Sequence, residues 1–452
     1  MKKLRFIDLF AGLGGFHQAL VRLGHTCVFA SELDTKLSAL YEKNFGLKPA
    51  GDIRTVNIKD IPSHDILCAG FPCQPFSKAG NQKGLQCPQW GDLIDYVITI
   101  LRRHRPEFFI IENVPNLVRH NDGKTWAGIK ESLEGAGYTI QDRGLSPHMF
   151  GIPQIRERAF IVGRRGELSK FRWPEPPKQK ELTIRTVLDK RPSESQKLGP
   201  HFIKYLEAWQ DFLDRFPKNE KLPSFPIWAM EFGATYPYEG KSPHARKFKR
   251  LGRYRGSFGK RLKGLSSEGV REALPPYARG KEKTFPDWKV DFIEKNRAFY
   301  QKHKKIIDPW LPRIQSFAPS FQKFEWNVQG GKRRIWDYVI QFRASGIRLK
   351  RPTTAPSLVA MTTSQVPVVA WERRYMTPRE CSRLQSMGNL KYLPTPKEAA
   401  YKALGNAVNV SVVEAIVRSL LTLAKDHRSI ERETTSRKSP VRRESRKEPA
   451  YA

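Results

Sequence analysis

Three features that could define a class of protein are scarce or missing in this chain of 452 residues. No apolar run approaches the ~18 residues of a membrane span, and the basic start leads into only a few apolar residues, so neither a span nor a secretory signal is expected. The five cysteines show no Cys-x-x-Cys spacing or matching histidine pairs, which argues against a disulfide framework or a zinc site and fits a reducing cytoplasm. Acidic residues are few, 45 against 80 Lys and Arg, which gives a net charge of +35. Such an excess attracts polyanions and makes nucleic acid the leading partner class.

Up to about residue 165, short β-branched runs alternate with amphipathic stretches. The runs predict strands over 4–9, 26–31, 65–69, 108–111 and 159–163, and the stretches predict helices over 15–23, 36–45, 93–104 and 126–136. Helices of these lengths suit right-handed crossovers. The pattern indicates a doubly wound α/β domain with a parallel sheet covered on both faces.

From about residue 170 the composition changes. Prolines cluster over 173–177, and aromatic residues then mix with Lys and Arg up to about 351, which indicates a second, irregular, basic domain. The segment 245–263 holds nine Lys or Arg, no acid, and the aromatic residues Phe248, Tyr254 and Phe258. Such a segment suits phosphate contacts supplemented by stacking, or it is a solvated basic loop.

The C-terminal part contains a helix start, a second helix and a polar tail. Thr377-Pro378-Arg379-Glu380 combines an N-cap, a proline at the first helical position and the glutamate of a capping box, so it is expected to build structure rather than chemistry. An amphipathic helix is predicted over 411–423. The tail over 425–452 has nine basic and five acidic residues and few apolar ones, and is expected to be disordered.

The first predicted strand ends in a glycine-rich turn, Phe6-Ile-Asp-Leu-Phe-Ala-Gly-Leu-Gly-Gly15. Glycines there let a ligand approach the backbone at a helix N-terminus. The third glycine of a dinucleotide fingerprint is replaced by His17, which disfavours a bound pyrophosphate. Glu32 ends the second strand, where a carboxylate can accept hydrogen bonds from a ribose diol. A nucleoside cofactor without a pyrophosphate fits, and Asp52 either contacts an adenine amino group or is an ordinary turn residue.

Cys73 follows the predicted strand 65–69 at the sheet edge where open α/β proteins bind ligands. Prolines at 72 and 75 fix the backbone around it, and a rigid, partly exposed thiol near basic groups is a credible nucleophile. Cys27, Cys68 and Cys381 are interpreted as buried structural cysteines. The loop that follows, with Lys78, Lys83 and three glycines, is either a mobile lid or a surface loop.

Glu112 ends the next strand, so it and Cys73 are expected to leave the same sheet edge. Arg156 and Arg158 alternate just before another strand, which predicts that their side chains point the same way. Paired guanidinium groups suit a phosphate or a polarised carbonyl.

Together these residues resemble the DNA (cytosine-5)-methyltransferase family, especially its bacterial modification enzymes. The resemblance covers nearly everything except the basic domain and the tail, and one departure is Trp90-Gly91, where the family often has Arg-Gly. The blocks that carry it are Asp8-Leu-Phe-Ala-Gly-Leu-Gly-Gly15, Glu32, Gly51-Asp52-Ile53, Pro72-Cys73-Gln74, Glu112-Asn113-Val114, Gln154 to Arg158, Arg379-Glu-Cys-Ser-Arg-Leu-Gln385 and Gly405-Asn-Ala-Val408.

The resemblance implies a Rossmann-like methyltransferase domain that binds S-adenosyl-L-methionine and flips a cytosine out of double-stranded DNA. It implies that the Cys73 thiolate adds to carbon 6, that Glu112 holds ring nitrogen 3 and the exocyclic amine, and that Arg158, aided by Arg156, orients the base. The residues it implies for the cofactor pocket are Phe10, Gly12, Leu13, Gly14, Glu32, Leu33, Asp52, Ile53, Pro72, Leu93, Asn406 and Val408.

The expected organisation is a first catalytic part over 1–170, a target-recognition domain over 171–372, a return segment over 373–424 that completes the catalytic domain, and the tail over 425–452. We expect no metal, a monomer, a cytoplasmic location at bacterial DNA, and a restriction–modification or phage-defence setting with a possible cognate restriction or defence protein.

Two other functions compete with this one. A transfer-RNA cytosine-5 methyltransferase shares the catalytic motifs, but that branch is compact. In this chain 220 residues separate Arg158 from the next shared block, which begins at Arg379, and a segment of that length suits major-groove reading. A silent DNA-binding module would require Cys73 or Glu112 to be nonfunctional despite full local context.

Overall fold

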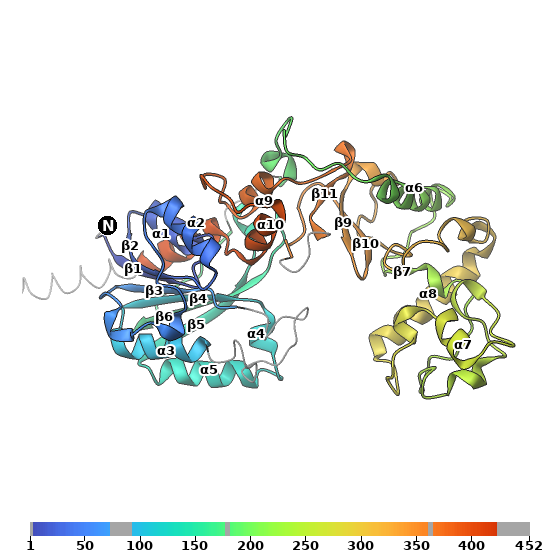
Figure 1. Cartoon of the computed structure of the whole chain (residues 1–452), viewed down its shortest axis with the longest axis horizontal. Coiled ribbons are helices and arrows are strands. Elements are labelled where there is room, and N and C mark those ends of the chain that lie inside the picture. The colour runs from blue at the N-terminus through green and yellow to red at the C-terminus, as the bar shows by residue number, and fades with distance from the viewer. Residues whose placement is uncertain (1–2, 73–92, 177–180, 360–364, 423–452) are drawn as a thin grey trace, which may run out of the picture. The chain divides into compact units, whose positions relative to one another are not determined.

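The computed structural model describes residues 3–72, 93–176, 181–359 and 365–422. The chain forms two compact units (Figure 1). The first takes Met1–Ser146, Glu157–Lys178 and the chain from Val408 on, and the second takes Pro147–Arg156 and Gln179–Ala407. These units divide the chain differently from the expected boundaries, because residues 147–156 and 373–407 are part of the second unit.

The first unit is built on a six-stranded sheet with the order β2-β1-β3-β4-β6-β5. Strands β1 to β4 are parallel, but β6 runs antiparallel to both β4 and β5. The prediction of a parallel sheet is therefore wrong at this edge, and β5 was not predicted. The strands are β1 (Arg5–Leu9), β2 (Thr26–Ser31), β3 (Ile66–Ala69), β4 (Phe108–Asn113), β5 (Tyr138–Leu145) and β6 (Arg158–Arg165).

Helices cover both faces of this sheet, with α1 and α2 on one side and α3 and α5 on the other (Figure 1). Side chains alternate along β1: Ile7 and Leu9 join the core beneath α3 and α5, while Phe6 packs against His17 of α1 on the opposite face. The helices are α1 (Gly15–Arg22), α2 (Thr35–Phe45), α3 (Leu93–His104), α4 (Asn116–Arg119) and α5 (Lys124–Glu134). The four helices expected here are confirmed to within two residues at each end.

The second unit is more regular than its sequence indicates. It holds a six-stranded sheet with the order β12-β11-β9-β10-β8-β7, so the prediction of an irregular domain missed a full sheet. The helices α7 and α8 form a separate helical part with its own buried cluster (Figure 1). The elements are α6 (Pro200–Asp214), β7 (Ile227–Trp228), α7 (Ser267–Ala273), α8 (Asp287–Ile307), β8 (Lys323–Trp326), β9 (Val339–Arg343), β10 (Gly346–Lys350), β11 (Val368–Val369), β12 (Arg374–Tyr375), α9 (Pro378–Leu384) and α10 (Lys397–Asn406).

A further helix over 410–422 follows α10 after a break at 407–409, close to the predicted span. By length and composition, Lys397–Thr422 is the one stretch among the described residues that could cross a membrane. However, 61% of its most apolar window is buried inside the protein. Burial of that kind is typical of a core helix, and it makes the stretch weak support for a membrane span.

Candidate active site

The ends of β3 and β4 position the first group of site residues. The two strands are parallel with Ala69 opposite Ile111, so Gly70, the first residue after β3, lies beside Glu112, near the end of β4. A Cβ on Gly70 would lie 3.8 Å from Oε2 of Glu112, which places this carboxylate beside the segment leading to position 73. The predicted shared edge is confirmed as far as the described chain reaches, at Pro72.

Glu112 forms an ion pair with Arg158. Nε of Arg158 lies 3.0 Å from Oε1 of Glu112, and the two side chains are only 18% and 9% exposed. Nη1 of Arg158 donates to the carbonyl of Glu157 at 2.7 Å. Among the described residues, Nη2 of Arg158 has no acceptor, so this group can donate to the carbonyl oxygen of a bound molecule.

Asn113 is a further residue at this edge. Its Nδ2 donates to the carbonyl of Phe71 at 3.2 Å, and its Oδ1 accepts the N–H of Val114 at 2.8 Å. The side chain is 1% exposed. It therefore ties the chain two residues before position 73 to the end of β4. The sequence analysis included Asn113 in a motif but assigned it no role, because the sequence does not show which group a single amide side chain will contact.

Cys73 lies outside the described residues, so its assignment as nucleophile stays a prediction. The same holds for the loop with Lys78 and Lys83, for Trp90-Gly91 and for the tail over 425–452. Cys68 and Cys381 are fully buried, and burial raises the pKa of both thiols. Cys27 is half-buried, with its pKa raised by burial to about 12. These three thiols hold little thiolate at neutral pH, which supports their structural interpretation.

Arg156 differs from the expectation. Its guanidinium donates to the carbonyls of Gly405 at 2.7 Å and Ala407 at 3.0 Å, both at the end of α10. It also donates to the carbonyl of Leu358 at 3.2 Å and to Ser357 Oγ at 3.3 Å, and the residue is 2% exposed. The prediction that Arg156 and Arg158 form a pair facing one ligand is wrong, because Arg156 is committed to backbone carbonyls within the second unit. It is a structural clamp on the segment that carries Asn406.

The glycine-rich turn after β1 has the backbone that its sequence predicts. Phe10, Gly12 and Gly14 have φ values of 58°, 53° and 71°. A Cβ on Gly14 would lie 2.4 Å from the ring of Phe45, so only glycine fits there. Leu13 is 4% exposed and turns its side chain into the core. The turn therefore offers backbone rather than side chains to a ligand.

Glu32 holds this turn from the end of β2. Its Oε2 accepts the N–H of Gly12 at 2.8 Å, and its Oε1 accepts the N–H of Asp34 at 2.8 Å. Burial raises the pKa of Glu32. A carboxylate has about four acceptor positions, so each oxygen keeps the capacity for one more donor. The pair of hydroxyl groups on a ribose matches that remaining capacity.

Asp52 is mainly a turn residue. Its carboxylate accepts the N–H of Arg54 and a bidentate contact from the same side chain, at 3.0 Å to Nε and 2.7 Å to Nη2. These hydrogen bonds lower the pKa of Asp52. The turn interpretation is confirmed, and a contact with an adenine amino group stays a prediction.

The other predicted cofactor residues differ in burial and in the unit to which they belong. Ile53 and Leu93 are buried in one hydrophobic cluster, whereas Leu33 is 48% exposed at the end of β2. Asn406 is exposed at the end of α10 in the second unit, and Val408 is buried in the first. Their contacts with a cofactor stay predictions. Among the described residues, no group of three or more His, Cys, Asp or Glu could hold a metal ion.

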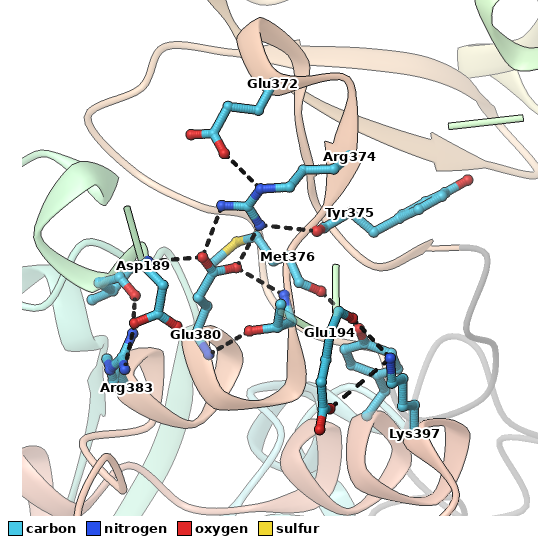
Figure 2. A network of polar contacts seen from close by, with 12 residues as sticks. Asp189, Glu194, Glu372, Arg374, Tyr375, Met376, Glu380, Arg383 and Lys397 are labelled. Carbon is cyan, nitrogen blue, oxygen red and sulfur yellow. Dashed lines mark hydrogen bonds and ion pairs between the residues drawn. The ribbon is translucent and has the colours of Figure 1, made fainter. Parts of the chain in front are cut away.

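The predicted capping box at Thr377 and Glu380 is confirmed. Glu380 also receives a bidentate contact from Arg374, with nitrogen–oxygen distances of 2.8 and 2.9 Å, and accepts the N–H of Asp189 at 2.9 Å (Figure 2). Arg374 and Glu380 are 1% and 0% exposed, and Glu372 is a second partner of Arg374 at 2.6 Å. This buried network joins β12 to α9, which confirms that the motif builds structure.

The basic segment 245–263 lies in the helical part of the second unit. Most of its nine Lys and Arg residues are exposed, and none forms an ion pair with an acid among the described residues. Phe258 has a left-handed backbone, φ 55°, and a Cβ on neighbouring Gly259 would lie 3.3 Å from the carbonyl of Gly233. The segment thus presents exposed positive charges that no acidic side chain among the described residues neutralises, and its backbone packs closely against Gly233.

These features define a class. A sheet of this order, with a glycine turn after β1, a carboxylate after β2 and an ion pair at the end of β4, is a Rossmann-like methyltransferase fold. The chain belongs to the C-5 cytosine-specific DNA methylases, whose family model matches residues 4–422. It is therefore an enzyme that methylates cytosine in DNA.

Named relatives agree with this family. The chain is similar to the Type II methyltransferase M.AluI of Cellulosimicrobium cellulans, 32% identical over 491 aligned residues that cover 92% of this chain and 91% of the relative. It is 45% identical to the Type II methyltransferase M.HhaI of Haemophilus parahaemolyticus over 175 residues, 38% of this chain and 53% of that protein. The crystal structure of a putative DNA modification methyltransferase encoded within an E. coli prophage shares the fold, with a TM-score of 0.50, 18% identity, and coverage of 94% of this chain and 100% of that one.

Proposed function

We propose that this methylase transfers a methyl group from S-adenosyl-L-methionine to carbon 5 of a flipped cytosine in a short, specific sequence of double-stranded DNA, through a covalent bond to Cys73. The observation that carries the proposal is the buried pair of Glu112 and Arg158 beside the segment that leads to position 73. It combines a carboxylate and a guanidinium donor at one sheet edge, as recognition of a cytosine ring requires.

The turn after β1 and the carboxylate after β2 would hold the cofactor. Glu32 would accept the ribose hydroxyl groups with the positions that Gly12 and Asp34 leave open. Phe10, Gly12 and Gly14 would present backbone to the remainder of the molecule. When bound, this cofactor supplies an electrophilic methyl group on a sulfonium.

The chain's own residues would then activate the base. Carbon 5 of cytosine is a poor nucleophile until a thiolate bond to carbon 6 breaks the ring conjugation, and Cys73 would form that bond. Glu112 would hold ring nitrogen 3 and the exocyclic amine, and Arg158 the carbonyl oxygen. After methylation, carbon 5 loses its proton to a base, the bond between sulfur and carbon 6 breaks, and the double bond and the thiolate are restored.

The cationic surface over 245–263 supports duplex DNA as the substrate. Exposed Lys and Arg without acidic partners release counterions from a phosphate backbone, and target bases must leave the stack to reach an enclosed site. The relatives are named Type II methyltransferases. We infer a restriction–modification setting in a bacterial cytoplasm, in which the protein acts as a monomer with a separate cognate endonuclease.

Methyl transfer to purified nucleic acids tests the proposal. The full chain is incubated with labelled S-adenosyl-L-methionine and either unmethylated plasmid DNA or unmodified transfer RNA. We expect label in DNA alone, loss of it with Cys73→Ala, and its retention with Cys381→Ala, which changes a buried thiol in α9. Label in transfer RNA would overturn the substrate, and label in neither would favour a silent DNA-binding module.

A further inference from the structure

A buried polar network lies next to the glycine-rich turn and has no part in the chemistry above. Asp8 of β1, His17 of α1 and Tyr41 of α2 are 1%, 7% and 1% exposed. The Tyr41 hydroxyl lies 2.7 Å from His17 Nδ1 and donates to Asp8 Oδ2 at 3.5 Å. Strand β1 and the two helices that cover one face of the sheet therefore share one set of hydrogen bonds.

The contacts of this network fit a neutral His17 and a protonated Tyr41. Burial raises the pKa of Asp8, and the Tyr41 hydroxyl also lies 3.8 Å from Sγ of Cys27. Burial lowers the pKa of His17 to about 4, so the ring is neutral and carries one N–H at neutral pH. Burial raises the pKa of Tyr41, which keeps its hydroxyl protonated. When Nδ1–H of His17 donates to the Tyr41 oxygen, the Tyr41 proton is left for Asp8, in agreement with the observed contacts.

Asp8 also caps α1 from outside the helix. The N-cap residue is Gly14, which has no side chain to accept a hydrogen bond. Instead, Oδ2 of Asp8 accepts the N–H of His17, the third residue of the helix, at 3.2 Å. This is the bond that a Ser, Thr or Asp at the N-cap would normally supply. Asp8 therefore fixes the start of α1 relative to β1, on either side of the turn.

Phe45 of α2 connects the same network to the turn itself. Its ring stacks on His17 with 4.1 Å between centroids and an angle of 23°. The same ring fills the space where a Cβ on Gly14 would lie, 2.4 Å away. Displacing Tyr41 or His17 therefore changes the surface against which Gly14 packs, while Glu32 holds Gly12 from the other side.

We propose that Asp8, His17 and Tyr41 are positioning residues that fix the turn Phe10–Gly15 in the shape that binds the cofactor. The inference rests on the proposed use of S-adenosyl-L-methionine by this turn. The residues act through the backbone of the turn, so their loss weakens cofactor binding and leaves the chemical step intact.

The test is Tyr41→Phe in the full chain, which removes one oxygen atom. We expect the Kd of S-adenosyl-L-methionine, measured by titration calorimetry, to rise about tenfold, the equivalent of one lost hydrogen bond. KM for the cofactor should rise by a similar factor, with kcat at saturation within about twofold of the native value. The matched control is Tyr138→Phe, because Tyr138 is buried in β5 of the same unit and its hydroxyl donates to the Pro106 carbonyl at 2.9 Å.

The outcomes separate positioning from simple stabilisation. If both variants lose similar thermal stability and neither changes the Kd, the network is only structural and the proposal is overturned. If Tyr41→Phe does not fold, Phe45→Leu tests the same route through packing and should raise the Kd as well; an unchanged Kd there also overturns it. If the native chain itself binds no S-adenosyl-L-methionine, the proposed function fails instead.

Discussion

Glu112 and Arg158 form a largely buried ion pair, with 3.0 Å between Oε1 and Nε, because β6 runs antiparallel to β4. If β6 ran parallel to β4, its first residue would lie beside the first residues of β4, at the opposite end of the strands from Glu112. The reversal brings Arg158 to the end of β4, where the segment toward position 73 also emerges. The topology of the sheet thus assembles the acid and the guanidinium of the site.

The same two strands provide a matched test of this pair. Arg158→Ala should lower kcat about 100-fold or more, because it removes a donor aimed at the base. Arg164→Ala breaks the ion pair of Arg164 with Glu107, at 3.1 Å, at the other end of β4 and β6. It should lower stability but leave kcat near the native value. Equal losses of kcat in steady-state assays of the two folded variants would contradict a specific role for Arg158.

Arg156 should behave as a structural residue. Arg156→Ala leaves the buried carbonyls of Gly405, Ala407 and Leu358 without a charged donor, so we expect the free energy of unfolding to fall by about 3 kcal/mol. Urea unfolding followed by fluorescence measures the loss. Native stability combined with a large fall in kcat would instead restore a role for Arg156 in orienting the base.

The Arg374–Glu380 pair should dominate the stability of the second unit near α9. Glu380→Gln removes the charge facing a guanidinium that is 1% exposed, and we expect a loss of about 3–5 kcal/mol in unfolding free energy. Glu372→Gln changes a partner of the same Arg374 that is 34% exposed, so its cost should be smaller. Denaturant midpoints compare the two variants, and a larger loss with Glu372→Gln would contradict the network shown in Figure 2.

His64 predicts a loss of stability at acid pH. Burial lowers the pKa of His64 from 6.5 to about 4, and its Nδ1–H donates to the Pro62 carbonyl at 2.8 Å, while Nε2 is buried without a partner among the described residues. Between these two pKa values the unfolded chain binds a proton that the folded chain does not, so stability falls as pH falls. The neighbouring groups His104 and Asp65 act in opposite directions on this pKa.

The expected loss from His64 is about 2 kcal/mol between pH 7 and pH 5. His64→Gln removes this titration, so its unfolding free energy should depend less on pH over that range. Urea unfolding at pH 7 and pH 5 measures both proteins. Parallel losses in the two would show that other groups cause the acid sensitivity.

Local patterns in the sequence were sufficient for the first four strands, the four longer helices of the first unit and the turn after β1, but not for α6 and α8 of the second unit. The period of apolar residues and the glycines determine these elements within a few residues. Thr377 and Glu380 were also predictable, because a capping box depends on residues only three positions apart.

Contacts distant in sequence account for what was missed. β5 is half polar, with only Tyr138, Ile140 and Leu145 buried, so it lacks the apolar run of an inner strand. Because β5 was not predicted, the antiparallel direction of β6 was not predicted either. Arg156 and Arg158 alternate as expected, but only the fold shows that Arg156 reaches the carbonyls at 405–407. The second sheet is built from strands of two to five residues, too short to stand out among aromatic and basic residues.

The most direct test of the account is bisulfite sequencing of plasmid DNA from a methylation-free host that expresses either the native chain or Cys73→Ala. We predict protected cytosines in one short sequence context with the native chain and none with the variant. Protection that persists with Cys73→Ala, or its absence with a folded native chain, would contradict the central claim that this methylase modifies cytosine through a Cys73 adduct.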